Sequence, residues 1–190
     1  MRLVSSLVLL ALTAGAAGTA PAQQAGAGAG LPPGFRDQQL ADLERERAMT
    51  LAMLDSMPER LIHFKPVPEV RDFMQQIAHA AQPVSAFAAR ARGAAPPALG
   101  DSAAYLNDRV ALRGMVNRSY DYAATALRGL SEADYLGPVT FFGRPTPRWK
   151  VFALALEHST WTRGELVPYF RLNGMAPPPF QLFPGAPGER

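Results

Sequence analysis

Histidines are the side chains of this sequence best suited to chemistry, and there are only three: His63, His79 and His158. Positions 158, 162, 165 and 169 recur every three or four residues, so on a helix they share one face. A histidine followed four residues later by a second ligand is the usual way in which one helix chelates a metal ion. Here the second position is Thr162, a poor ligand, and Glu165 follows on the same face. The spacing leaves two interpretations of His158 open, a hydrogen-bonded core histidine or a metal ligand.

The other two histidines lie in different settings. His79 comes two positions after the apolar Ile77, about 200° away around a helix, and beside Gln75 and Gln82. This pattern puts His79 on the polar side of its helix, facing either a cleft between helices or bulk water. His63 lies in a proline-containing linker without a partner at useful spacing, and we interpret it as a surface residue.

The composition excludes several classes of protein. The chain has 190 residues and no cysteine, which rules out disulfide scaffolds, Cys-ligated zinc sites, iron–sulfur clusters and cysteine nucleophiles. It holds no Ser/His/Asp motif of a hydrolase, no phosphate loop and no Rossmann glycine pattern. The 17 Arg and two Lys exceed the 16 acidic residues by only three and do not cluster, so we expect no nucleic-acid partner.

The first residues have the pattern of a secretory signal peptide. Arg2 precedes an apolar run over residues 3–12, and Ala20-Pro21-Ala22 places small residues on the N-terminal side of a cleavage site. The run is shorter than the ~20 apolar residues of a membrane span. We therefore predict a signal peptide over residues 1–22, cleaved before Gln23. The product would be secreted or periplasmic, with no membrane association in the mature form. The alternative is an uncleaved N-terminal anchor.

The rest of the chain divides into a linker, one domain and a tail. Residues 23–34 are rich in Ala, Gly and Gln and end in prolines, which is typical of a flexible linker. Residues 35–178 hold the apolar pattern of a folded domain, and residues 179–190 are rich in Pro and Gly. With 48% hydrophobic residues the chain is too apolar to be disordered, and its length favours a single domain.

Apolar residues at helical spacing predict four helices. The first spans about 37–57, with the block Glu44–Arg47 mostly on a solvated face. The second starts at residue 68 or 69 and ends before a loop at 93–100. The third runs from residue 101 or 102 to about 130, and the fourth covers about 148–172. No strand pattern is seen, so we predict an all-α fold, a four-helix bundle with long first and third connections. Phe141 and Phe142, in the connection at 137–147, are expected to pack onto the bundle.

Two segments resemble the DinB-like superfamily over about residues 35–178. The region of the family's second helix is matched by residues 57–59, by 64–73, which begin Phe64-Lys65-Pro66-Val67-Pro68, and by Ile77-Ala78-His79-Ala80. The family's fourth helix usually reads His, three residues, His, Arg or Tyr, Gly, then Gln or Asn. The matching residues here are Glu157-His158-Ser159-Thr160-Trp161-Thr162-Arg163-Gly164-Glu165-Leu166, followed by 169–174 and Pro177-Pro178.

The resemblance implies a four-helix bundle with an open end and a divalent metal, zinc or nickel. The metal would be held by one histidine of the second helix and two of the fourth, which correspond here to His79, His158 and the position of Thr162. Glu165 departs from the family pattern as well. One hypothesis is that Glu165 replaces the third ligand, although it lies about 10 Å along a straight helix from His158. A kink at Pro168 would bring it closer. The other hypothesis is that the metal has been lost.

Two functions from different classes follow. The first is an exported, divalent-metal-dependent hydrolase or transferase, in which the metal activates water or a thiol. The second is a non-catalytic bundle that binds a small molecule or a protein partner in the former metal site. The resemblance also implies a homodimer, since members of this superfamily often dimerise.

Overall fold

The computed structural model describes residues 30–182 of the chain. The predicted signal peptide, the predicted linker up to residue 29 and residues 183–190 of the predicted tail lie outside this range. Within the described part, no helix combines the length and apolar character needed to cross a membrane.

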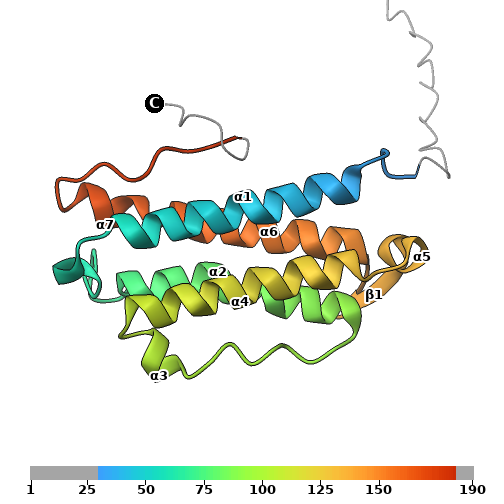
Figure 1. The fold of residues 1–190 in the computed structure, drawn as a ribbon, viewed down its shortest axis with the longest axis horizontal. Helices are drawn as coiled ribbons and strands as arrows, with labels where there is room; N and C mark the ends of the chain where they lie inside the picture. The colour runs from blue at the N-terminus through green and yellow to red at the C-terminus, as the bar shows by residue number, and fades with distance from the viewer. Residues whose placement is uncertain (1–29, 183–190) are drawn as a thin grey trace, which may run out of the picture. The chain divides into compact units, whose positions relative to one another are not determined.

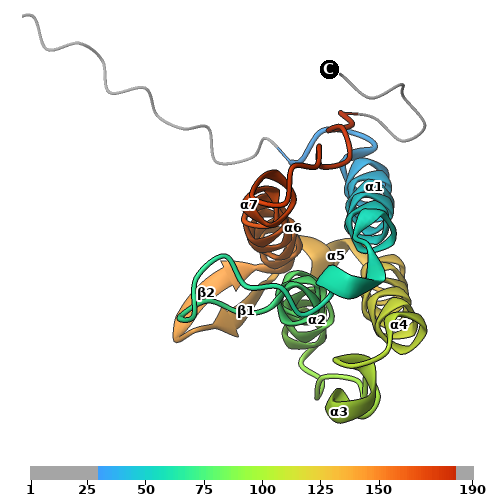
Figure 2. The same cartoon turned by 90° about the vertical axis from the view of Figure 1, so that its left-hand side faces the viewer.

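Four long helices make up most of the described chain. They are α1 (Phe35–Ser56), α2 (Phe73–Arg92), α4 (Arg109–Arg128) and α6 (Arg148–Gly164). Helix α2 packs against α6 and α4, and α1 packs against α4 and α6, as Figure 1 and the end-on view in Figure 2 show. The fold is therefore mostly helical, as the apolar spacing predicts.

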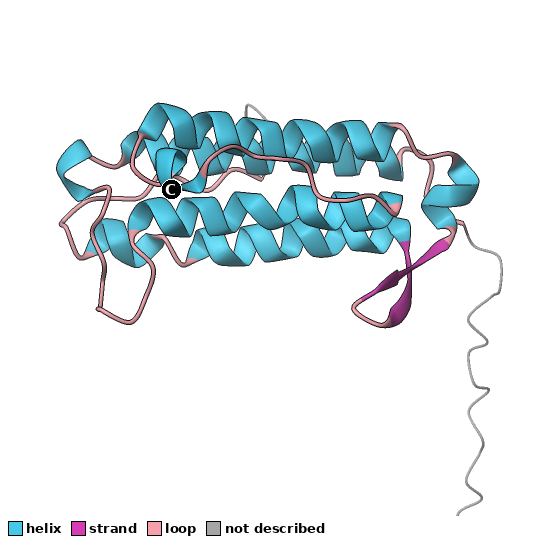
Figure 3. Cartoon of the chain, turned by 90° about the horizontal axis from the view of Figure 1, so that it is seen from below, coloured by secondary structure: helices cyan, strands magenta, loops and turns pink. Residues whose placement is uncertain are grey.

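Short elements occupy the connections. A single 3-10 turn, η1 (Glu59–Leu61), follows α1, while α3 (Ser102–Tyr105) and α5 (Glu132–Leu136) flank α4. A hairpin of β1 (Pro138–Phe141) and β2 (Arg144–Pro147) leads into α6, with Val139 opposite Thr146 (Figure 3). This hairpin corrects the prediction of a chain without strands. Each strand has four residues and holds at least one proline, so the alternation that identifies strands is missing from the sequence.

The start of α2 differs from the prediction. The helix begins at Phe73 and not at residue 68 or 69, because Asp72 forms a capping box with Gln75. Asp72 Oδ1 accepts from the backbone N–H of Gln75 at 2.8 Å, and Gln75 Oε1 accepts from the backbone N–H of Asp72 at 3.0 Å. Residues 62–72 therefore form a loop that lies over the start of α2, where the N–H groups of Phe73 and Met74 bond the carbonyls of Phe64 and Ile62.

Two predicted helices are interrupted. The helix expected from residue 101 makes one turn, and the chain restarts as α4 from a second cap, Asp108, whose side chain accepts from the N–H of Ala111. The helix expected over 148–172 ends at Gly164 and resumes as α7 (Val167–Arg171). Pro168 has no N–H to bond the carbonyl of Gly164, and its ring crowds that carbonyl, which explains the break.

Helix α2 is the most buried of the four long helices. Its small residues Ala80, Ala81, Ala88 and Ala89 are fully buried, which lets both α4 and α6 approach its backbone. It also contains Pro83, which cannot bond the carbonyl of His79. Close to this proline, the Ser119 hydroxyl of α4 bonds the backbone of α2: it donates to the Ala81 carbonyl at 2.6 Å and accepts from the N–H of Ser85 at 3.2 Å.

The core lies between the four long helices. Its largest fully buried side chains include Leu43, Leu54, Phe73, Ile77, Leu112, Met115, Tyr120, Tyr135, Phe152 and Phe170. Phe141 is buried as predicted, and its ring lies 5.0 Å from that of Phe87 on α2. Phe142 contacts the same ring at 6.1 Å but is 68% exposed, so the prediction that it packs onto the bundle is only partly right.

Candidate functional site

Two of the three histidines lie side by side. Helices α2 and α6 run antiparallel, since the start of α2 contacts the end of α6 through Gln76 and Thr162 while Arg148 at the start of α6 reaches Ala91. This arrangement places His79 of α2 opposite His158 of α6. Their ring centroids are 5.2 Å apart and the rings meet edge to face. The Nδ1 atom of His158 is buried and has no hydrogen-bond partner in the described part of the chain.

Both imidazoles favour the neutral form. Burial is the main cause that lowers the pKa of His79, and the charges of Arg71 and His158 lower it further. Burial is also the main cause that lowers the pKa of His158, with a smaller contribution from Arg71. The carboxylate of Glu165 opposes these effects at both rings. Near pH 7 the pair therefore presents neutral nitrogens, the form that binds metals and accepts hydrogen bonds.

Glu165 is held by two hydrogen bonds. Its Oε2 accepts from Nε2 of Gln76 at 2.7 Å, and its Oε1 accepts from Nε1 of Trp161 at 3.1 Å. Gln76 is buried and also donates to the backbone carbonyl of Thr162 at 3.0 Å. The carboxylate thus connects the end of α6 to the start of α2 and is already engaged by two protein donors.

A third metal ligand does not converge on the histidine pair. Thr162 is buried on α6 but offers no imidazole, and the Glu165 oxygens are engaged elsewhere. Across residues 30–182 no three His, Cys, Asp or Glu side chains are grouped closely enough to hold a metal ion. As arranged, these residues do not fit the three-ligand metal that the resemblance implies, because a catalytic zinc site needs three protein ligands.

Two pockets share Arg71 as a lining residue, and His79 lines the second of them. The larger, of about 560 Å³, is lined by Pro66, Glu69, Val70, Arg71, Gln76, Glu165, Pro168 and Tyr169. The second, of about 360 Å³, is lined by Arg71, Gln75, Ala78, His79, Gln82, Tyr105 and Leu106. Arg71 borders both pockets, is exposed, and forms no ion pair with any residue of the described range. We call the two pockets together the cleft.

The loop that carries Arg71 is fixed by α7. The Tyr169 hydroxyl donates to the backbone carbonyl of Arg71 at 2.6 Å. Its ring packs at steep angles against Phe64 in the loop and Phe73 at the start of α2. His63, in the same loop, is half exposed and contacts Asp72 through Nδ1 at 3.1 Å. It lies at the surface as predicted, but Asp72 is a partner that the spacing along the chain did not reveal.

The comparison with protein families identifies the superfamily of this chain. The DinB superfamily model matches residues 42–160. The chain belongs to the DinB superfamily. A comparison with curated proteins gives no match. The match contains His79 and His158 and ends two residues before Thr162, so both departures of this DinB-superfamily chain, Thr162 and Glu165, lie just beyond it.

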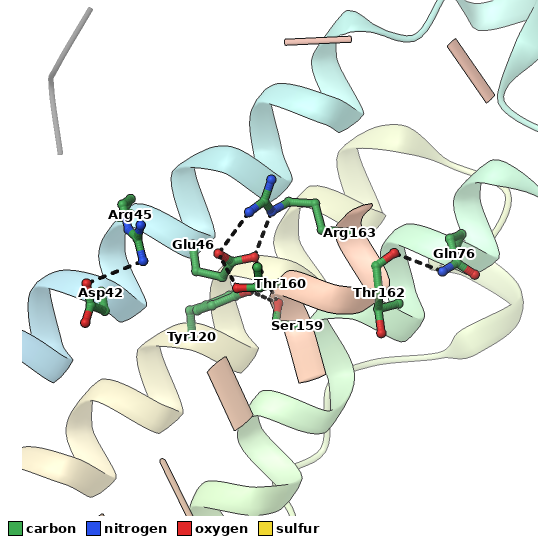
Figure 4. A network of polar contacts seen from close by, with 9 residues as sticks. All are labelled: Asp42, Arg45, Glu46, Gln76, Tyr120, Ser159, Thr160, Thr162 and Arg163. Atoms are coloured by element: carbon green, nitrogen blue, oxygen red, sulfur yellow. Dashed lines mark hydrogen bonds and ion pairs between the residues drawn. The ribbon is translucent and has the colours of Figure 1, made fainter. Parts of the chain in front are cut away.

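A buried polar network behind the histidine pair holds α6 in this DinB-superfamily fold (Figure 4). Arg163 of α6 donates from Nε to Glu46 Oε1 of α1 at 2.7 Å, and from Nη2 to Oε2 at 3.2 Å. Thr160 donates to the same carboxylate at 3.1 Å, and Ser159 bonds the Tyr120 hydroxyl of α4 at 2.8 Å. Burial is the main cause that raises the pKa of Tyr120, and the charge of Glu46 raises it further.

The network includes a residue that sequence analysis misplaced. Glu46 belongs to the block predicted to be mostly solvated, yet it is only 2% exposed. The spacing along the helix does indicate that Glu46 is buried. Glu46 follows the buried Leu43 by three positions and precedes the buried Thr50 by four, so it lies on the apolar face. Charged residues on such a face are buried only when paired, and the partner, Arg163, lies more than a hundred residues away in the sequence.

Proposed function

We propose that this chain is an exported binding protein of the DinB superfamily whose four long helices form the family's four-helix bundle. Its cleft holds a small molecule with a carboxylate group and does not depend on a catalytic metal. The observation that carries this proposal is Arg71, an exposed guanidinium without an ion-pair partner in the described residues, at the junction of the two pockets and beside two neutral imidazoles.

The charge around the second pocket favours an anion. Its lining includes Arg71, His79 and the amides of Gln75 and Gln82, and no carboxylate. Arg binds carboxylates through two parallel hydrogen bonds, and neutral imidazole and amide groups add further donors. The first pocket contains Glu69 and Glu165, so its lining disfavours a second anion there. The carboxylate of a ligand therefore belongs between Arg71 and His79.

The test of this proposal begins with metal content. The protein starting at Gln23, purified without a His tag, is measured by plasma mass spectrometry after incubation with zinc or nickel. We expect far less than one metal per chain in the wild type, because only two histidines converge. Thr162→His restores the third ligand of the family pattern, and we expect it to raise the metal content toward one per chain. Adding His79→Ala to that variant is expected to abolish the gain.

The second measurement is ligand binding. Thermal stability is followed in the presence of small carboxylates for the wild type, Arg71→Ala and the matched surface variant Arg60→Ala. We expect stabilisation by a carboxylate in the wild type and in Arg60→Ala, and its loss in Arg71→Ala, because ligand that binds only the folded state raises its stability. Equal responses in the two arginine variants would contradict the proposal.

A metal-dependent hydrolase or transferase is the second candidate function. The 5.2 Å approach of the His79 and His158 rings favours it, since it supplies two neutral ligands on neighbouring helices. Glu165 would complete a site of two His and one carboxylate only after leaving Gln76 and Trp161. Stoichiometric zinc or nickel in the wild type, lost in His79→Ala and in Glu165→Gln, would overturn the metal-free site of the first proposal and favour this function.

The proposal also includes export of the protein and the formation of a homodimer. The signal-peptide pattern of residues 1–22 supports a secreted or periplasmic location, and no nucleic-acid partner is expected from the scattered basic residues. The family resemblance supports a homodimer. Light scattering coupled to gel filtration measures the mass directly, and a monomer at micromolar concentration would remove the homodimer from the proposal.

A further inference from the structure

A third pocket opens on the far side of His158. It has a volume of about 300 Å³ and is lined by Phe87, Phe141, Leu154, Glu157, His158 and Trp161. His158 therefore stands between this pocket and His79, which lines the cleft. Three of the six lining residues carry benzene or indole rings, so the pocket differs sharply from the polar pocket around Arg71. We call it the aromatic pocket.

The hairpin supplies one wall of the aromatic pocket. Phe141, the last residue of β1, contacts the ring of Phe87 at an angle of 77°, and Phe87 in turn lies 6.0 Å from the ring of His158. The next residue, Phe142, has a positive φ of 45°, which is unfavourable for a bulky side chain. Its ring lies 4.6 Å from that of Phe141, and the Arg90 guanidinium lies 5.2 Å from its centroid. The turn thus keeps the exposed Phe142 against the buried Phe141.

Trp161 of α6 also lines this pocket. It is 75% exposed, an unusual position for so large an apolar side chain. Its indole is nevertheless fixed, because Nε1 donates to Glu165 at 3.1 Å. An exposed aromatic ring held in one orientation beside other rings can cover a ligand at little cost in side-chain entropy.

We infer that the aromatic pocket receives an aromatic ring and that the ligand of the cleft is an aryl carboxylate. This inference rests on the proposed function and names its ligand class. The ring would lie between Phe87, Phe141 and Trp161, and the carboxylate would reach past His158 to His79 and Arg71. A cavity of roughly 150 Å³ lined by apolar side chains binds benzene, so 300 Å³ accommodates one or two fused rings. Steeply inclined rings favour such a guest through edge-to-face contacts.

Binding of phenylbutyrate to the protein starting at Gln23 tests the inference. The two indole N–H groups of Trp149 and Trp161 are followed by heteronuclear NMR, and Trp161→Phe assigns the second signal by removing it. We expect phenylbutyrate to shift the Trp161 signal in a saturable way and to leave Trp149 in place. Hexanoate, which has the carboxylate without the ring, and phenylbutanol, which has the ring without the carboxylate, are each expected to bind at least tenfold more weakly.

Substitutions in the protein distinguish the contribution of the ligand's ring from that of its carboxylate. The affinities are measured by calorimetry. Trp161→Ala is expected to weaken phenylbutyrate roughly tenfold and to leave hexanoate unchanged, while Trp161→Phe retains most of the affinity because it keeps a ring. Val110→Ala, which removes an equally exposed apolar side chain on α4, is the control and should change neither. Equal affinities for hexanoate and phenylbutyrate, unaffected by Trp161→Ala, would overturn the inference while leaving the proposed function standing. Failure of both carboxylates to bind would overturn both.

Discussion

The two imidazoles at the centre of the site have different neighbours from those of a family metal centre. In place of a third histidine they face Arg71, which forms no ion pair within residues 30–182, and a carboxylate already bound by Gln76 and Trp161. Neutral His79 and His158 add no further positive charge beside Arg71 in this partly buried site. At the residue scale, the protonation state of the pair is therefore the property to measure.

We predict that both histidines titrate below the ordinary pKa of 6.5 when followed by NMR of their ring protons. Arg71→Ala is expected to raise both pKa values, because the guanidinium repels the imidazolium form. Glu165→Gln is expected to lower both, because it removes the charge that favours that form. The opposite signs distinguish a charge effect from a general loosening of the site, which would shift both pKa values in the same direction in both variants.

The same shifts give a stability prediction with a defined sign. A histidine whose pKa is lower in the folded protein binds fewer protons there than in the unfolded chain. The stability that such a histidine contributes is fully present above pH 6.5. It is lost as the pH falls through that value toward the pKa of the folded protein. Urea denaturation between pH 7.5 and 5 should therefore show falling stability, and the double variant His79→Asn, His158→Asn should fall less steeply over this interval.

The two histidines can be predicted from the sequence, but their surroundings cannot. His79 and His158 were predicted from the family resemblance, and the helical arrangement brings them together. Glu165 accepts from Trp161 four positions earlier in the sequence, a local spacing. Its hydrogen bond from Gln76 joins residues 89 positions apart and depends on the antiparallel contact of α2 and α6, which no local spacing encodes. Arg71 was not singled out for the same reason, since its loop is positioned by Tyr169 from the other end of the chain.

At the scale of elements, one buried ion pair holds α1 against α6. Glu46 and Arg163 are both buried, and Nε and Nη2 of Arg163 each donate to one oxygen of Glu46. We predict that Arg163→Ala lowers the free energy of unfolding by about 3–5 kcal/mol, because it leaves the Glu46 carboxylate buried without its cation. Chemical denaturation measures this loss.

An exposed ion pair provides the control for that prediction. Arg113 on α4 pairs with Asp55 on α1, and both side chains are largely in water. Arg113→Ala should cost less than about 1 kcal/mol, as exposed pairs usually do. A double variant, Glu46→Leu with Arg163→Met, should recover most of the stability lost in Arg163→Ala. If Arg163→Ala cost no more than Arg113→Ala, the pair would not hold the two helices together.

The capping box at the start of α2 is the second element that can be tested. Asp72→Ala removes the acceptor for the N–H of Gln75 and should cost about 1 kcal/mol in the free energy of unfolding. Asp72→Asn keeps an acceptor oxygen and should cost less, although it removes the charge facing His63. Urea denaturation of the three proteins at pH 7 compares them. Equal losses in both variants would assign the stability to the charge rather than to the cap.

Element boundaries were predicted less well than the elements themselves. The apolar spacing gave four long helical regions, but α2 begins later because the prolines at 66 and 68 belong to a loop and Asp72 is the true cap. The break after Gly164 follows from Pro168, whose effect was expected only as a kink. The hairpin could not be anticipated, because its register depends on a turn at Phe142 and Gly143 with positive φ at both positions.

At the scale of the whole molecule, residues beyond the family match contribute to the first pocket of the cleft and to the aromatic pocket. The match ends at residue 160, whereas Trp161, Glu165 and Tyr169 lie after it. Tyr169 and Phe170 pack against Phe73 and so connect this segment to the start of α2. The match covers Arg71 and the histidine pair, and the following residues add Glu165 and Tyr169 to the first pocket and Trp161 to the aromatic pocket.

The last prediction concerns the full-length chain and its destination. Expressed in a bacterial host with its own first 22 residues, the protein should be recovered outside the cytoplasm and should begin at Gln23, because Arg2, the apolar run and Ala20-Pro21-Ala22 have the order of a signal peptide. Intact-mass spectrometry of the exported fraction identifies the cleavage point. Replacing Ala20 and Ala22 with bulky residues should leave the uncleaved chain attached to the membrane, since the peptidase accepts only small side chains there. A cytoplasmic, full-length product from the unaltered sequence would contradict export, whereas a membrane-bound full-length product would instead support the uncleaved anchor.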